Sequence, residues 1–240
     1  MGLLGTFFMA YASLHAGLEP SLHFRVMLSH ATQLSKPWLY AAFVLLLIGY
    51  GTKMGLAPMH AWKPDAYGEA PAVVGALLAG GVTSCAFLAL VRVFQVCTAA
   101  GEGPHLGKLL IFMGLFSMAV AGVFLIGQKD FKRMLAYSSI EHMGILALGL
   151  GIGGPALFGV FLHLVNNAIA KGVLFLSAGN IHRAYNGKTT DWVLGVLRRL
   201  PFSGAFFLAG FLAITGSPPF GPFISQFVLL HAAFGAGRYV

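Results

Sequence analysis

The sequence predicts an all-α protein, a polytopic membrane helix bundle with about seven transmembrane helices. Only 9% of its 240 residues are charged, whereas soluble domains average about 25%. Its mean hydropathy is +0.81. The apolar runs are continuous and about 20 residues long, which suits a membrane-spanning helix and is too long for the alternating strands of a transmembrane barrel. Together these observations exclude a soluble globular domain, a disordered chain and a disulfide scaffold.

Seven apolar segments follow one another, and each is expected to be helical because a helix pairs its own backbone polar groups in lipid. The segments are 1–16, 38–57, 72–94, 108–127, 134–150, 156–180 and 202–234. The mixed stretch 21–36 is expected to lie at the membrane interface as a short helix. The first segment is too short to span comfortably, and the last stops just after an apolar stretch. We therefore expect residues 1–240 to be a single transmembrane domain and a fragment of a longer chain.

Two of these segments are interrupted. The second runs through Gly49, Gly51 and Gly55 to Pro58, and the last contains the Pro-rich stretch 216–222, after which the apolar run resumes. Interrupted segments in two halves of a sequence are typical of inverted-repeat transporters with broken helices. The alternative is that the prolines simply end helices. Apolar residues on both sides favour a break in the last segment.

The basic residues in the connections predict an orientation. The connections after the second, fourth and sixth segments carry more Lys and Arg than the others, with Lys63 counted among them. Because cytoplasmic loops are enriched in Lys and Arg, these connections are expected on the cytoplasmic side. The same enrichment accounts for the net charge of +8 without a nucleic-acid partner.

Three charged residues fall inside apolar segments: Lys53, Glu141 and Lys171. Each costs at least about 2.5–3.5 kcal/mol at a helix centre, so such groups are usually paired, hydrated or functional. The alternative is that their side chains reach the interface. We favour a function for the two lysines, which lie in the middle of their runs, and leave both readings of Glu141 open.

A polar stripe runs along segment 156–180. His163, Asn167 and Lys171 are spaced i, i+4 and i+8, so they share one helix face, with Asn166 beside them. A single buried histidine would more often be a core residue. A histidine, amides and a lysine on one face fit a hydrated proton relay better, because imidazole exchanges protons near neutral pH. His142 is included among the candidate pathway residues.

No metal-ligand spacing, nucleotide-binding loop or nucleophile motif is present in the sequence. We therefore expect no cofactor and no metal in this chain, and no catalytic residue for bond-making chemistry. Any enzymatic label would belong to a complex that contains it.

Three stretches resemble a known family: 49–71, with Gly-Tyr-Gly-Thr-Lys followed by Pro-Met-His-Ala-Trp-Lys-Pro-Asp; 128–144, with Ser-Ser-Ile-Glu-His-Met-Gly; and 163–179. They are similar to the proton-conducting, antiporter-like subunits of respiratory complex I, Mrp-type sodium/proton antiporters and group 4 nickel–iron hydrogenases. The forms are most similar to those of hydrogenase-4 component F. The resemblance covers most of the chain, with the three motifs in order.

The resemblance implies that the chain corresponds to helices six to twelve of about fourteen, built as two inverted five-helix repeats. It implies that Lys53 is the central proton site of the first half-channel, and that Lys171 with His163 connects the two half-channels. Glu141 falls on the tenth helix, where it mirrors a glutamate of the fifth.

The resemblance also marks candidate positions for helix breaks and for the proton exit. In addition, this sequence differs from the family pattern at several positions. The break and exit positions are Pro58, His60, Pro219 and Gln226. Gln226 stands where a Lys or Glu is common, which raises the expectation of a weakened second half-channel. Many family members have a second histidine where this chain has Asn167. The fifth-helix glutamate expected beside Lys53 lies upstream of this sequence.

Three functions remain after these arguments. The first is a proton-translocating subunit of a redox-driven complex, with other membrane subunits and a cytoplasmic redox arm as partners. The second is a subunit of a Mrp-type sodium/proton antiporter. The third is a non-conducting structural remnant. We rank them in this order and expect a multi-pass protein of a bacterial or archaeal inner membrane.

Overall fold

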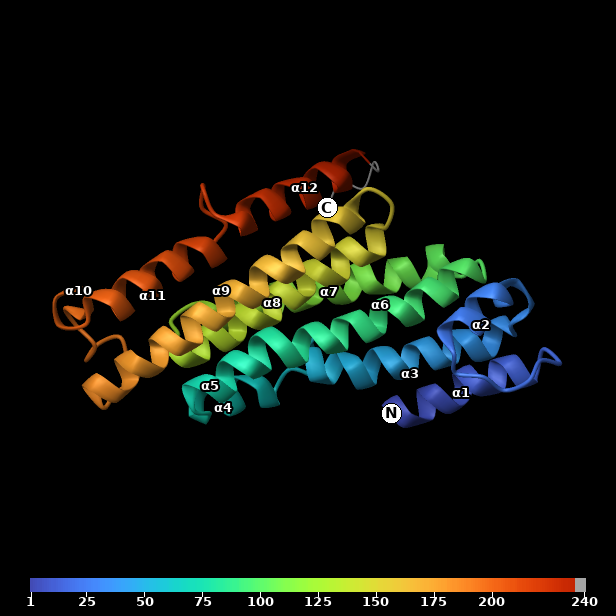
Figure 1. Ribbon diagram of the computed structural model, residues 1–240, viewed down its shortest axis with the longest axis horizontal. Helices are drawn as coiled ribbons and strands as arrows, with labels where there is room; N and C mark the ends of the chain where they lie inside the picture. The colour runs from blue at the N-terminus through green and yellow to red at the C-terminus, as the bar shows by residue number, and fades with distance from the viewer. Residues whose placement is uncertain (236–240) are drawn as a thin grey trace.

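Long helices that run roughly along one axis make up the computed structural model, which describes residues 1–235 (Figure 1). The described residues contain no β-strand, so the all-α prediction is confirmed. The first half consists of α1 Gly2–Leu14, α2 Phe24–Ser29, η1 Ala31–Gln33, α3 Lys36–Met54, α4 Trp62–Glu69, α5 Ala72–Ala76, η2 Leu77–Val82 and α6 Thr83–Ala99. The second half consists of α7 Gly103–Leu125, α8 Phe131–Ile152, α9 Ala156–Tyr185, α10 Val196–Arg199, α11 Pro201–Ile214 and α12 Gly221–Gly235.

Five helices in the described residues are long and apolar enough to cross a membrane. They are α3, the continuous unit Ala72–Ala99, α7, α8 and α9. Three further apolar helices, α1, α11 and α12, are shorter. The expected count of seven spans is therefore not confirmed, because the first segment forms a short helix and the last is divided in two. The stretch 21–36 forms only the short α2 and η1, as expected.

The first predicted break follows α3. Gly55 takes the left-handed conformation, with φ at 79°, and the N–H groups of Gly55 and Leu56 both donate to the carbonyl of Gly51. This pattern closes a helix end and favours glycine, which has no Cβ to clash. The chain then turns past Pro58 and resumes as α4.

The second break separates α11 from α12. Gly216 has φ at 70°, and the prolines at 218 and 219 lack the N–H groups that a continuous helix would need. The apolar helix α12 follows at once. The interruption predicted in segment 202–234 is confirmed, and it gives the two short helices α11 and α12.

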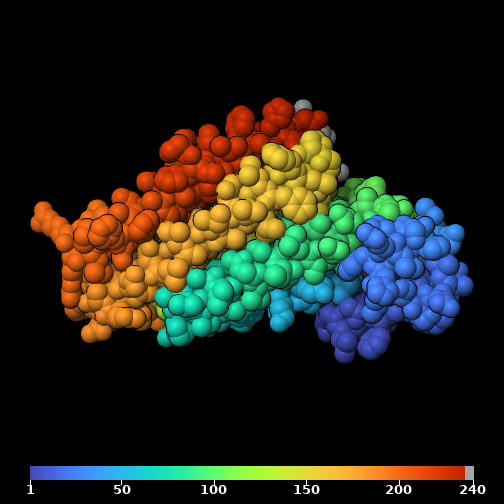
Figure 2. Space-filling view, in the orientation of Figure 1, coloured from blue at the N-terminus to red at the C-terminus, as the bar shows by residue number. Residues whose placement is uncertain are grey.

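The helix α9 lies at the centre of the second half. It packs against α8, α11, α12 and α5. In the space-filling view, the α5–α6 unit in green and α9 in yellow to orange lie side by side, with α11 and α12 covering the other flank of α9 (Figure 2). A polar residue on the inner side of α9 is consequently shielded by several helices.

The α7–α8 pair has the most extensive contact among the described helices. Glycines face each other across it, Gly107 against Gly151 and Gly114 against Gly144. A Cβ on Gly114 would lie 2.6 Å from the carbonyl oxygen of Gly144. Small residues let helix backbones approach in a membrane, where packing replaces the hydrophobic effect between helices.

Charged segments meet at one end of the bundle. Lys129 pairs with Asp191 at 2.7 Å and Arg133 with Asp65 at 2.8 Å. Lys188 pairs with Glu69. Helix α4, the connection from α7 into α8 and the connection after α9 thus share one end, which agrees with placing them on one side of the membrane. These pairs join three segments that are far apart in the sequence.

Candidate functional site

The polar stripe of α9 is buried. His163, Asn167 and Lys171 each have 0% of their surface exposed. Their spacing places them on one face of a continuous 30-residue helix, and this face is covered by α8 and α12. The bundle therefore encloses a row of polar groups about 12 Å long, measured along the axis at the usual helical rise.

His163 joins two neighbouring helices through hydrogen bonds. Its Nε2 lies 2.9 Å from Nδ1 of His142 on α8, and its Nδ1 lies 2.9 Å from Oγ of Ser225 on α12. The Ser225 hydroxyl in turn donates to the carbonyl of Pro222 at 2.9 Å. Because a carbonyl can only accept, the Ser225 hydroxyl accepts from Nδ1–H of His163, and Nε2 of His163 accepts from Nδ1–H of His142. The two rings and the hydroxyl form one directed chain.

Lys171 lies two helical turns from His163 on the same face. Its Nζ donates to the backbone carbonyl of Leu135 on α8 at 2.9 Å. It is close enough to interact electrostatically with Glu141 and His142. Both amide atoms of Asn167, which lies between Lys171 and His163, are buried and have no hydrogen-bond partner among the described residues. Such groups are normally satisfied by ordered water.

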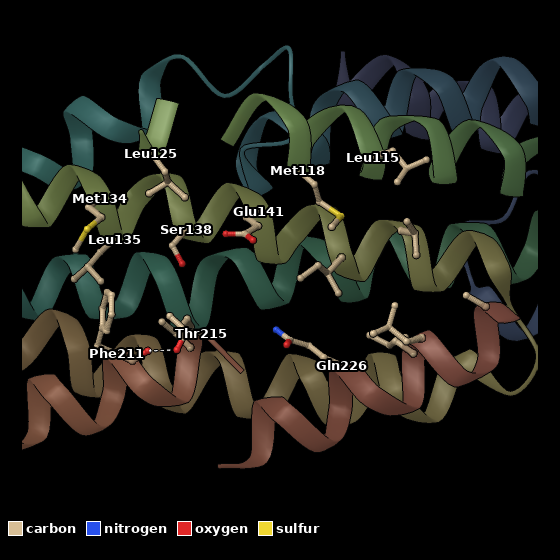
Figure 3. Close-up of a pocket in the computed structure, with 16 residues that line it drawn as sticks. Leu115, Met118, Leu125, Met134, Leu135, Ser138, Glu141, Phe211, Thr215 and Gln226 are labelled. Atoms are coloured by element: carbon tan, nitrogen blue, oxygen red, sulfur yellow. Dashed lines mark hydrogen bonds between the residues drawn. The ribbon is translucent and has the colours of Figure 1, made fainter. Parts of the chain in front are cut away.

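Glu141 lines a cavity of about 700 Å³ between α7, α8, α11 and α12. The close-up shows the Glu141 carboxylate and the Gln226 amide on opposite walls of this cavity, with Ser138 and Thr215 toward the α11 end (Figure 3). The rest of the lining is mostly leucine, methionine and phenylalanine. The acidic group on α8 and the amide on α12 therefore share one space.

Lys53 lies apart from these groups. It occupies the last turn of α3 with an exposed side chain, and no hydrogen bond or ion pair holds it within residues 1–235. Its sequence position had placed it in the middle of an apolar run. Helix α3 instead ends one residue later, because Gly55 closes it.

The other break residues flank the helix interruptions. Pro58 is exposed in the turn after α3, and Pro219 is exposed in the turn before α12. His60 is half-buried, packs near the ring of Phe124, and has an unpartnered Nδ1. None of the three belongs to the buried chain on α9.

Lys63 is not the loop lysine that the sequence predicts. It is fully buried on α4 and donates to the carbonyl of Met54. The buried hydroxyls of Tyr67, Ser139 and Ser225 were also missed. No sequence signal marks Lys63, because a lysine between Trp62 and Pro64 looks the same on a loop as in a protein interior. The hydroxyls of serine and tyrosine carry no sequence signal of burial either.

No group of three or more His, Cys, Asp or Glu side chains within residues 1–235 is arranged to hold a metal ion. The site is built from proton donors and acceptors. Such groups are suited to passing protons between nitrogen and oxygen atoms.

Residues 1–240 match the family described as "NADH:quinone oxidoreductase/Mrp antiporter, TM". A hydrogenase-4 component F homolog of Methylacidiphilum infernorum is 36% identical over 238 residues, which cover 98% of this chain and 50% of that protein. NADH-quinone oxidoreductase subunit N of Desulforudis audaxviator is 34% identical, covering 86% of this chain and 42% of that protein. The chain thus spans about half the length of the curated relatives it matches.

Solved structures show the same fold. A chain of the membrane-bound sulfane sulfur reductase, an archaeal respiratory membrane complex, aligns with a TM-score of 0.88 and 28% identity, over 99% of this chain and 49% of that one. A chain of the Mrp complex from Dietzia sp. aligns with a TM-score of 0.83 at 22% identity, over 99% of this chain and 44% of that one.

Proposed function

Because the chain belongs to the NADH:quinone oxidoreductase/Mrp antiporter family of transmembrane proteins, we propose that it is part of a proton-translocating membrane subunit. The subunit works within a redox-driven complex of the hydrogenase or NADH:quinone oxidoreductase type. The observation that carries the proposal is the buried row from Lys171 to Ser225, which joins three helices by proton donors and acceptors. Groups this polar are rare in membrane interiors unless they serve a pathway.

The proton route follows this row. A proton on Lys171 passes through water held at Asn167 to His142 and His163, and leaves toward Ser225 on α12. Glu141 tunes Lys171 by its negative charge and faces the cavity that it shares with Gln226. Gln226 can hold water in place but cannot carry a charge, so Glu141 supplies the acidic group at this cavity.

The driving force comes from partner subunits. Changes of charge in a neighbouring membrane subunit or in a cytoplasmic redox arm alter the protonation of Lys171 and Glu141, as a nearby charge does for any buried titratable group. Lys53 is exposed on α3, where it can receive protons from a neighbouring segment. This chain contributes no cofactor, and we place the complex in a bacterial or archaeal inner membrane.

Replacing Lys171 tests the proposal. In the full-length protein, assembled in its complex in inverted membrane vesicles, Lys171→Met should lower proton uptake by at least about tenfold, because a positioned proton-transfer group typically contributes about 10²–10⁴-fold in rate. Methionine keeps the packing volume but binds no proton. Uptake is measured with a pH-sensitive dye during substrate oxidation.

The matched control is Lys108→Met, which removes an exposed lysine of α7. It should leave uptake within about twofold of the unmodified complex, a change of under about 0.5 kcal/mol in barrier. If Lys171→Met pumped protons at the unmodified rate in assembled complex, the proposed route would be wrong.

A second candidate is a sodium/proton antiporter subunit, favoured by the fold shared with the Mrp complex. Mass spectrometry of the gently solubilised complex separates the two. Co-purification of iron–sulfur or nickel subunits supports the redox-driven complex, whereas their absence from an intact, active assembly supports the antiporter.

A further inference from the structure

A second buried lysine lies at the first helix break. Lys63, on α4, has 0% of its surface exposed, and its Nζ donates to the carbonyl of Met54 at 2.5 Å. Its methylene groups fill the space beside Gly55 that any Cβ would occupy. Lys53, on the outer side of the same break, is exposed. The break therefore presents one lysine outward and another inward.

The hydrogen bonding of Lys63 is incomplete. An ammonium group has three N–H donors, whereas Lys63 finds one acceptor among residues 1–235, the carbonyl of Met54. Its Nζ lies 5.4 Å from the centre of the Tyr67 ring. No carboxylate pairs with it in the described part of the chain. A buried amine with one acceptor and no counter-ion is suited to exist both with and without its proton.

Tyr67 lies between Lys63 and helix α9. Its side chain is fully buried, and its hydroxyl has no hydrogen-bond partner among residues 1–235. The ring packs edge-on against Phe175 at 5.5 Å, and Phe175 lies one helical turn beyond Lys171 on the same face. Lys63 and Lys171 are close enough to interact electrostatically.

The buried hydroxyl of Ser139 on α8 is likewise unpartnered. It lies one turn after Leu135, whose carbonyl holds Lys171. Together with Tyr67, it gives two hydroxyl groups with free hydrogen-bonding capacity near the two lysines. Such groups can hold water between titratable side chains.

We propose that Lys63 is the inward-facing proton site of the first helix break, and that it exchanges protons with Lys171 through the Tyr67 hydroxyl and water. The proposal rests on the proposed function. In the transfer, Lys63 loses a proton from Nζ, the hydroxyl or a water accepts one proton as it releases another, and the neutral amine of Lys171 gains one. Only N–H and O–H bonds form and break. Lys53 would then load this site from the outer side.

A structural role is the competing explanation. A fixed positive charge at Lys63 would stabilise the carbonyl end of α3, as cations do at helix C-termini. The two roles differ in whether the proton must leave. Arginine keeps its proton at all accessible pH values, so it can replace a fixed charge but cannot act as a relay.

The experiment compares Lys63→Met, Lys63→Arg and Tyr67→Phe in the full-length complex, reconstituted in vesicles. Proton uptake and substrate oxidation are measured in the same preparation. Both Lys63 variants should lower uptake by at least about tenfold, and Tyr67→Phe should lower it severalfold, while the complex stays assembled. Lys132→Met is the control, because Lys132 is also buried and donates to one carbonyl, that of Ala70, at the end of the bundle. It should retain uptake within about twofold.

Uptake restored by arginine would assign Lys63 a fixed-charge role and overturn the proposal. Unmodified uptake in Lys63→Met would place it off the route. If Lys63→Met fails to assemble, Lys63→Arg and Tyr67→Phe decide, and unmodified uptake in both overturns the proposal. Lys171→Met in the same vesicles separates the two hypotheses: if it stops uptake while the Lys63 variants do not, only this inference fails, and if none of the variants matters, both fail.

Discussion

Single hydrogen bonds give the buried chain of polar groups at the centre of the bundle its direction. The carbonyl of Pro222 accepts from Ser225, and this assigns one neutral tautomer to each of the linked histidines. A proton taken up by the two linked rings can be balanced by a shift along the same links toward Ser225. This direction fits the proposed route from α8 to α12.

Replacing His163 by leucine should interrupt this chain. Leucine suits the apolar packing of α9 but leaves the ring of His142 and the hydroxyl of Ser225 without their shared partner. We expect proton uptake to fall by at least about tenfold and stability to fall by about 1–3 kcal/mol. Dye-based uptake and thermal unfolding of the complex measure the two effects.

The control is His105→Leu, because His105 is exposed on α7 and pairs only with Glu102 at the opposite end of the bundle. This variant should change neither proton uptake nor the thermal stability of the complex appreciably. Normal uptake in assembled His163→Leu would show that protons bypass the histidine pair.

Glycine contacts set the geometry of the helix pairs that carry these side chains. Gly107 and Gly114 on α7 are seven residues apart, as are Gly144 and Gly151 on α8, so two close contacts occur two turns apart. Helix α8 also carries His142 and Glu141. The separation between α7 and α8 therefore fixes where these two side chains lie relative to α9.

Gly114→Leu should push α7 away from α8, because a Cβ there meets the backbone of Gly144 and Leu148 rather than a flexible side chain. We expect a loss of about 1–3 kcal/mol or failed assembly, as overpacking of a tight contact produces. Gly122→Leu is the matched control on the same helix, since a Cβ on Gly122 meets nothing within 4 Å. Thermal unfolding in detergent compares the two, and equal stability of both variants would contradict the glycine-contact explanation.

Over the whole molecule, the ion pairs lie at the two ends of the apolar bundle. Ion pairs gather at the end of the bundle where α4 meets the connections after α7 and α9, and a further pair, Lys36 with Glu102 at 3.7 Å, lies at the other end. The hydrogen bond from Lys188 lowers the pKa of the Glu69 carboxyl, and the same contact raises the pKa of Lys188. This pairing holds the loop after α9 against the end of α4.

The sign of the pH effect follows from the lowered pKa of Glu69. The stabilisation that the ionised Glu69 carboxylate gives to this pairing is complete above pH 4.5, the ordinary pKa of the group. It is lost as the pH falls through the lowered pKa of the folded state. Hydrogen exchange of residues 186–192, corrected for intrinsic rates, should therefore rise below pH 4.5. Lys188→Ala should raise it already at neutral pH, whereas Lys36→Ala at the opposite end should not. Unchanged exchange in Lys188→Ala would show that the loop is held by other contacts.

Composition and spacing were sufficient for the membrane class, the helix order, the break in segment 202–234 and the shared face of His163, Asn167 and Lys171. These follow from short-range rules: apolar length, helical period and the backbone limits of glycine and proline. The number of spans did not follow, because the count included the first and last segments, whose helices α1, α11 and α12 are shorter than the five long apolar helices.

The contacts between segments that are distant in the sequence could not be predicted, because they depend on how the helices pack. The link from His142 through His163 to Ser225 needs three helices, the Glu141 cavity needs four, and Lys63 is buried where α4 packs on α8 beside the end of α3. A lysine beside a proline has the same sequence appearance on a loop as in a protein interior. Its burial, like the exposure of Lys53, depends on which helices surround it, and that is set by tertiary structure.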